Sequence, residues 1–146
     1  MKKNEIVEQL DVSMSHIVKK HIHVCDADLR KRIAKGMKIA TKFDIPENEI
    51  SNRIMEVIQE ETGGIIACVM EWLADTADRG DFYVYKDLDC VIGHGYLHDR
   101  WHDWRKGSIE CSAIFVVLRK CNAYIQVVTA FPYTSRRDIQ MHLKKL

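Results

Sequence analysis

The chain has 146 residues, and its 22 Lys and Arg residues nearly balance its 21 Asp and Glu residues, which leaves a formal net charge of +1. A chain of this length fits one domain, residues 1–146, whose core needs no disulfide or metal to support it. The balanced charge excludes a protein that binds nucleic acid through a uniformly basic surface, so a site for a polyanion must be a local patch.

The sequence predicts neither a membrane segment nor a signal peptide. The longest apolar runs, such as residues 63–70 and 113–118, are too short to span a bilayer. Residues 1–12 include acidic side chains where a signal peptide needs an apolar stretch. The five cysteines are an odd number and form no CxxC pair, which is typical of reduced thiols. We therefore expect a cytoplasmic protein.

A first amphipathic helix is predicted from Met14 to Ile22, where apolar residues recur with helical spacing. His21 falls on the apolar side of this helix, whereas His16 and Lys20 project elsewhere. Five positions on an α-helix correspond to about 500° of rotation, so His16 need not face His21. A histidine on an apolar side can be a core residue satisfied by a backbone carbonyl or part of an active site.

A second helix is predicted from Asp26, a suitable N-cap, to Gly36. Its inward positions are expected to be Leu29, Ile33 and Met37. Arg32 borders that buried face, so its guanidinium could be a surface cation or could reach a site beside the helix.

Two further helices follow. One opens at Pro46, which suits a helix start, and directs Ile50, Ile54, Val57 and Ile58 inward before Gly63-Gly64 breaks it. The other covers residues 65–76 and is buried through Ile65, Ile66, Val69, Trp72 and Leu73.

After Gly80 the pattern changes to strands. The runs 81–88, 90–97, 112–120 and 124–131 are rich in β-branched and aromatic residues, and the last two predict an antiparallel hairpin. Helices followed by strands indicate an α+β domain, with N-terminal helices packed on a C-terminal antiparallel sheet. The basic segment 134–146 is expected to be a dispensable tail.

Alternation along the last strand places Val127, Thr129 and Phe131 on one side, and Val128 and Ala130 on the other. A hydroxyl therefore stands beside an aromatic ring near the strand end. This is also ordinary strand composition.

The segment 93–107 contains His94, His98 and His102, four residues apart. On a helix they would share one face, as zinc ligands can. The glycines around them favour a strand or loop, where the three side chains would scatter. An aromatic and basic loop that contacts RNA through its exposed side chains is the other interpretation; those side chains are Arg100, Trp101, Trp104 and Arg105.

Taken in order, these motifs resemble the bacterial RNase A-like toxin domain found at the C-termini of contact-dependent growth inhibition proteins and related polymorphic toxins. The resemblance covers about residues 15–133. It rests on His16, His21-Ile22, Leu29 and Arg32 at the family's spacing, then "ATKF" (40–43), "VMEWL" (69–73), "VIGHG" (91–95) and Thr129-Ala130-Phe131-Pro132. The chain departs from the family at His23-Val24, where small or polar residues are usual, and at Phe131, where Tyr is more usual.

The resemblance implies an endoribonuclease that cleaves RNA without a metal or cofactor, through attack of the ribose 2′-hydroxyl on the neighbouring phosphorus to give a cyclic phosphate. Histidine suits the proton transfers, and arginine suits the charge on the phosphoryl oxygens. The implied catalytic residues are His21, Arg32, Thr129 and Phe131, with His16 in a supporting role. The implied RNA contacts are Lys20, Arg100, Trp101 and Arg105.

The resemblance also implies a toxin that inhibits the growth of bacterial target cells from within their cytosol. Such a domain needs a cognate immunity protein, which should be acidic where it docks, and we expect the chain itself to be a monomer. Two alternatives stay open: an inert RNA- or protein-binding module of the same fold, and a zinc-dependent hydrolase built on segment 93–107. The second proton-transfer group stays unassigned, with His16 the nearest candidate.

Overall fold

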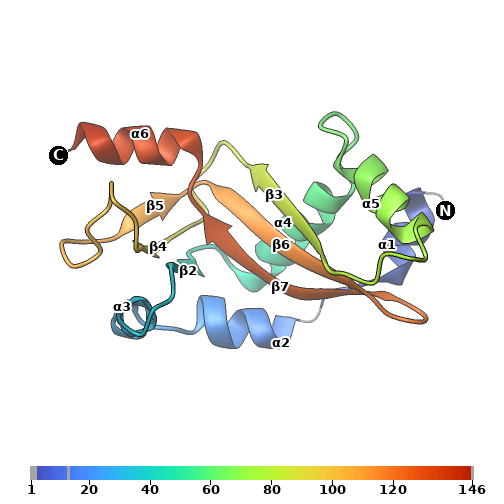
Figure 1. The fold of residues 1–146 in the computed structure, drawn as a ribbon, viewed down its shortest axis with the longest axis horizontal. Helices are drawn as coiled ribbons and strands as arrows, with labels where there is room; N and C mark the ends of the chain where they lie inside the picture. Colours follow the sequence, from blue (N-terminus) through green and yellow to red (C-terminus); the bar gives the residue numbers. More distant parts are fainter. Residues whose placement is uncertain (1–2, 13, 146) are drawn as a thin grey trace.

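Two β-sheets with helices around them form an α+β fold in the computed structural model, which describes residues 3–12 and 14–145 (Figure 1). The predicted fold class is therefore confirmed. The larger sheet has the order β1–β7–β6–β3, and the smaller one the order β2–β4–β5. Within the described residues, β1–β7 is the only parallel pair of strands. The strands of the larger sheet are β1 (Leu10–Asp11), β3 (Phe82–Asp87), β6 (Ala113–Lys120) and β7 (Ile125–Tyr133). Those of the smaller sheet are β2 (Ile39–Phe43), β4 (Gly93–Leu97) and β5 (Ile109–Cys111).

The helices lie on both sides of the larger sheet. In Figure 1, α1 and α5 lie at one end, α4 lies behind the larger sheet near its middle, α2 and α3 lie below β7 and β2, and α6 lies at the opposite end. Their bounds are α1 (Lys3–Gln9), α2 (Met14–Ile17), the π-helix η1 (Val18–Ile22), α3 (Asp26–Ala34), α4 (Glu47–Ile58), α5 (Ile65–Ala74) and α6 (Arg136–Lys144). Among the described residues, no helix combines the length and the apolar character needed to cross a membrane.

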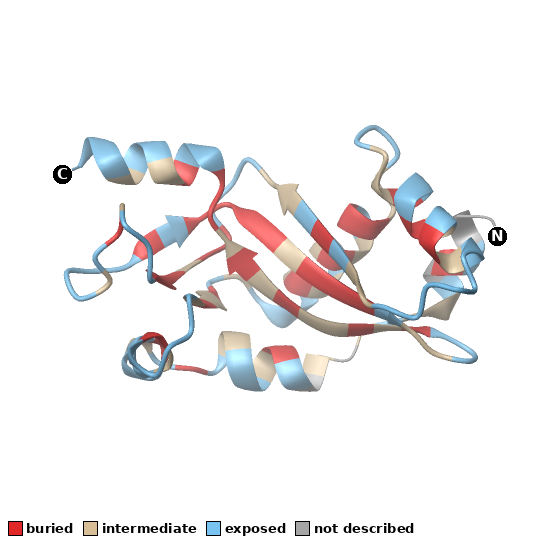
Figure 2. Ribbon diagram, viewed as in Figure 1, coloured by how far each residue is buried: buried red, intermediate tan, exposed pale blue. Residues whose placement is uncertain are grey.

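The main core lies between the larger sheet and helices α1, α4 and α5. Most residues of β6 are buried, whereas burial along β7 alternates except at Val128 and Thr129 (Figure 2). The inward positions predicted for α4 are all buried, and α5 buries Ile66, Val69 and Trp72. A smaller core holds α3 against β2 and β4. This second core fixes α3, and hence Arg32, beside the smaller sheet.

Two details of the second predicted helix were wrong. Met37 is 51% exposed, because α3 ends at Ala34 and the chain turns at Gly36, whose φ is 111°. Asp26 is not the N-cap, a position that Cys25 occupies. The Asp26 carboxylate instead accepts hydrogen bonds from Tyr96 and His94 of β4.

Of the smaller sheet, the sequence predicted only β4, as part of the run 90–97, and β4 begins at Gly93. The other two strands, β2 and β5, are short and were missed. Its strands also come unusually close. A Cβ atom at Gly95 would lie 2.3 Å from the Ala40 carbonyl oxygen and 2.6 Å from the Cα of Thr41. Glycine is therefore required at position 95, where β4 pairs with β2.

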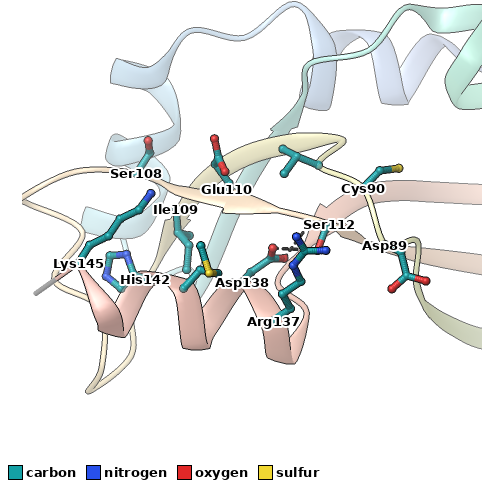
Figure 3. Close-up of a pocket in the computed structure, with 12 residues that line it drawn as sticks. Asp89, Cys90, Ser108, Ile109, Glu110, Ser112, Arg137, Asp138, His142 and Lys145 are labelled. Atoms are coloured by element: carbon teal, nitrogen blue, oxygen red, sulfur yellow. Dashed lines mark hydrogen bonds between the residues drawn. The ribbon is translucent and has the colours of Figure 1, made fainter.

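The segment expected to be a dispensable tail forms helix α6 and packs against β5 (Figure 3). Ser135 and Asp138 form a capping box at its start. The buried Asp138 carboxylate also accepts hydrogen bonds from the backbone N–H of Ser112, at 2.6 Å, and from its hydroxyl, at 2.8 Å. At the other terminus, Ile6 of α1 is fully buried in the main core. Helices α1 and α6 are therefore both packed into the fold.

Replacing Asp138 by Ala should lower the free energy of unfolding by about 1.5–3 kcal/mol, because it leaves buried donors of Ser112 and Ser135 without their charged acceptor. Chemical denaturation checks this, with Arg137→Ala, at an exposed position of the same helix, as control. Equal stabilities for the two variants would contradict the structural role of the α6 cap.

Candidate active site

His21 is held between the two sheets. Its Nδ1 lies 3.2 Å from the carbonyl oxygen of Thr41 in β2, and its Nε2 lies 3.4 Å from the hydroxyl oxygen of Thr129 in β7. A carbonyl oxygen can only accept, so Nδ1 carries the proton and donates it. Nε2 therefore keeps its lone pair and accepts from the Thr129 hydroxyl. A backbone carbonyl therefore satisfies one ring nitrogen of His21, as expected for a core histidine, and the other nitrogen faces a side-chain hydroxyl.

Burial lowers the pKa of His21 from 6.5 to about 4. The hydrogen bond to Thr41 opposes this shift, while the positive charges of Arg32, His16 and Lys20 add to it. At neutral pH the ring is therefore uncharged, which is the form that can accept a proton.

His16 lies beside His21, in contrast to the expectation from α-helical geometry. Residues 18–22 form a π-helix, whose i→i+5 bonding is seen in the bond from His23 N–H to the Val18 carbonyl at 2.7 Å. This wider turn brings residues five positions apart to the same side. The His16 and His21 ring centroids are 5.9 Å apart, in an edge-to-face arrangement. His16 is exposed, so it borders the site from the solvent side.

Thr129 and Phe131 reach His21 from β7. The Phe131 ring centroid is 5.6 Å from that of His21. The predicted neighbour on their side, Val127, instead faces the main core together with Ala130. The register of β6 and β7 shifts at this point: Val117 pairs with Thr129, but the next residue, Leu118, pairs with Val127. Val128 is therefore an extra residue with no partner in β6. Such a bulge reverses the alternation and turns the following side chains toward another face.

Arg32 links α3 to the π-helix. Its NH1 group donates to the Lys20 carbonyl at 2.9 Å. This bond places the guanidinium beside His21, whose pKa it helps to lower. The Lys20 side chain is exposed near the same edge of the site.

Thr41 belongs to the site but was not singled out from sequence, although it lies within the "ATKF" motif. Its carbonyl holds His21, and its buried hydroxyl donates to the Pro132 carbonyl at 2.6 Å. Thr41 thus joins β2 of the smaller sheet to β7 of the larger one at the point where His21 lies. A hydroxyl residue in a strand carries no such signal by itself.

The three predicted RNA-contacting residues of the 93–107 segment make their contacts elsewhere. The Trp101 ring packs against His102 and against His142 of α6, each at 5.8 Å between ring centroids. Arg105 lies over the Trp104 ring, and Arg100 is exposed. A cleft of about 250 Å³ between α6 and β5 (Figure 3) likewise contains none of the predicted catalytic residues.

His94, His98 and His102 are separated in the structure. His94 contacts Asp44 at 2.7 Å and Asp26 at 2.9 Å through its two ring nitrogens. Burial opposes its charged form, but these hydrogen bonds outweigh burial and raise the pKa of His94. His98 is exposed, whereas His102 is buried. Within residues 3–12 and 14–145, no group of three or more His, Cys, Asp or Glu side chains is arranged to hold a metal ion.

Comparisons with known proteins identify one similarity of fold. No protein-family model matches the sequence, and a search of curated proteins gives no match. A chain of the crystal structure of a CdiA-CT/CdiI complex from Y. kristensenii 33638 superposes with a TM-score of 0.63 and 14% sequence identity. The match covers 82% of this chain and 99% of that one. The chain therefore shares the α+β fold of that protein.

Proposed function

We propose that this protein is an endoribonuclease that cleaves RNA through its 2′-hydroxyl without a metal ion. The observation that carries the proposal is the geometry of His21: Nδ1 is tied to the Thr41 carbonyl, which fixes the tautomer, and Nε2 faces the Thr129 hydroxyl. An imidazole that is neutral at pH 7 and holds a lone pair on Nε2 can act as a general base once a substrate hydroxyl replaces that of Thr129.

In the proposed reaction, the ribose 2′-hydroxyl takes the place of the Thr129 hydroxyl at Nε2 of His21. Nε2 accepts the 2′-proton while the 2′-oxygen attacks the adjacent phosphorus. The bond from phosphorus to the 5′-oxygen breaks, which leaves a 2′,3′-cyclic phosphate. The ribose supplies the nucleophile, so the step needs no metal-bound water.

The other roles follow from position. His16, exposed beside His21, is the group best placed to protonate the leaving 5′-oxygen. The Arg32 guanidinium keeps donors beyond the one bound to the Lys20 carbonyl, and these can bind the phosphoryl oxygens. Thr129 and Phe131 would position the ribose and stack on a base.

We further propose that the protein is a toxin of the contact-dependent growth inhibition type that acts in the cytosol of its target cell. The shared fold with a chain of a CdiA-CT/CdiI complex supports this, as do the motifs found in the sequence. A cognate immunity protein would dock on the patch of Lys19, Lys20 and Arg32 beside His21. Its docking face should be acidic, and association should weaken with salt.

His21→Ala should lower the rate of RNA cleavage by about 10²–10⁴-fold, the usual contribution of acid–base catalysis, while the protein stays folded. A gel assay with purified protein and single-stranded RNA, with and without chelator, measures this. His98→Ala, an exposed histidine outside the site, is the control. A fully active His21→Ala protein would remove His21 from the mechanism, and cleavage lost with chelator would indicate a metal-dependent reaction.

The dependence on pH should reflect the low pKa of His21. Below about pH 4 the ring is protonated and cannot accept a proton, so the acid limb of kcat/KM should be centred near pH 4. The pKa of His21 is about 6.5 in the unfolded chain and about 4 in the folded protein, so between these values the unfolded chain binds more protons. The free energy of unfolding should therefore fall as the pH falls from about 6.5 to about 4. An acid limb centred near pH 6.5 in the folded protein would contradict this.

Arg32→Lys should lower cleavage by about tenfold or more, because an ammonium group cannot bind the phosphoryl oxygens and the Lys20 carbonyl in the same planar geometry. Arg30→Lys, at an exposed position two residues earlier in α3, should leave the rate unchanged. Full activity of Arg32→Lys would show that Arg32 contributes only charge.

Expression of the wild-type chain in bacteria should stop growth, and His21→Ala should restore it, because toxicity depends on cleavage. Growth curves with immunoblots of soluble protein test this. Normal growth of cells that contain abundant soluble wild-type protein would contradict the toxin proposal.

A further inference from the structure

Five aromatic side chains lie on the face of the larger sheet that is turned away from the main core. They are Tyr83 and Tyr85 of β3, Phe115 of β6, and Phe131 and Tyr133 of β7. Their strand neighbours Val84, Val116 and Ala130 are buried in the core on the opposite face. We call this set the aromatic face.

The rings of the aromatic face form a continuous series of contacts that begins at His21. Phe131 lies against His21 and stacks on Phe115, with 5.2 Å between centroids and 25° between planes. Phe115 lies 6.0 Å from Tyr83. A second branch runs from Phe131 to Tyr133 and on to Tyr85, at 6.4 and 6.0 Å. The series therefore leads from the candidate base to β3, the edge strand of the sheet.

The outer rings are exposed, and a hydrogen bond holds one of them in place. Tyr83 is 63% exposed and Tyr85 is 47% exposed. The Tyr85 hydroxyl donates to the Thr134 carbonyl at 3.1 Å, which fixes its ring. Neighbouring exposed aromatic rings on a small chain mark a binding surface. Rings already held in place lose little entropy when a ligand packs on them.

A cavity of about 450 Å³ lies where the second branch ends. Its lining includes Tyr85, Tyr133 and Trp101, together with Arg136 and Asp99. Trp101, which lies away from His21, thus joins the aromatic face at its far end. The cavity offers ring surfaces, a cation for a phosphate, and a carboxylate that can accept from the amino group of a base.

We propose that the aromatic face binds unpaired bases of single-stranded RNA next to the bond placed at His21. This rests on the proposed ribonuclease function and specifies its substrate class. A row of rings accepts bases of any sequence by stacking, and cations stand at both ends for the phosphates: Lys20 and Arg32 near His21, and Arg136 in the cavity. In a duplex the bases are paired and stacked on one another, so they cannot use this surface.

Binding of fluorescently labelled oligoribonucleotides to His21→Ala protein tests the proposal without cleavage. Tyr83→Ala and Tyr85→Ala should each weaken binding of a single strand by at least about fivefold. Tyr83→Phe keeps the ring and should bind normally. Tyr124→Ala is the matched control, because Tyr124 is 43% exposed in the turn between β6 and β7, outside the aromatic face. A duplex, and an abasic strand of equal length, should bind more weakly than the single strand.

The proposal is overturned if the single strand does not bind, if both alanine variants bind it like Tyr124→Ala, or if the abasic strand or the duplex binds as tightly. The face would then serve a protein partner. Base-dependent binding without cleavage by the wild-type protein would reject the ribonuclease proposal and keep the aromatic face. Cleavage with binding unaffected in both variants would reject the aromatic face alone.

Discussion

The hydrogen bond between His21 and the Thr41 carbonyl is the contact on which the candidate site depends. It fixes which nitrogen of His21 carries the proton and where the other one points. The strand that supplies this carbonyl is held in turn by the Thr41 hydroxyl, which donates to Pro132 of β7. A single threonine therefore bonds both to the His21 ring and to the strand on the opposite side of that ring.

This placement has a cost, because burying an imidazole disfavours its charged form. The same burial keeps the ring uncharged at neutral pH, and a pKa of about 4 makes it a weaker base than an ordinary histidine. Arg32 and Lys20 add to this effect, because their positive charges disfavour protonation of the ring. In the proposed reaction the same two cations would bind the phosphate.

The features that could be predicted from the sequence are those in which helix or strand spacing is regular. The inward face of α4, the β6–β7 hairpin and the proximity of Thr129 to Phe131 all follow from regular helix or strand spacing. The π-helix and the β7 bulge could not be predicted in this way, because each inserts one residue into a repeat. Those two irregularities bring His16 to His21 and turn Thr129 and Phe131 away from the core.

Other features were missed for different reasons. Helix α6 had a readable signal, since Ser135 and Asp138 have the spacing of a capping box, but the basic composition of the segment suggested a tail. The role of Thr41 depends on a backbone carbonyl and a contact across 91 positions of sequence, which no local pattern encodes. The aromatic face needs the register of three strands, and that register is known only from the structure.

In the mechanism that we propose, the ribose 2′-hydroxyl is the nucleophile and His21 takes its proton. The most direct measurement uses a DNA oligonucleotide that contains one ribonucleotide, with the new ends identified by mass spectrometry after incubation with the wild-type protein. We predict cleavage only on the 3′ side of the ribonucleotide, which leaves a 2′,3′-cyclic phosphate and a 5′-hydroxyl, and no cleavage by His21→Ala. Cleavage at deoxyribonucleotides, or products that carry a 5′-phosphate, would contradict the mechanism.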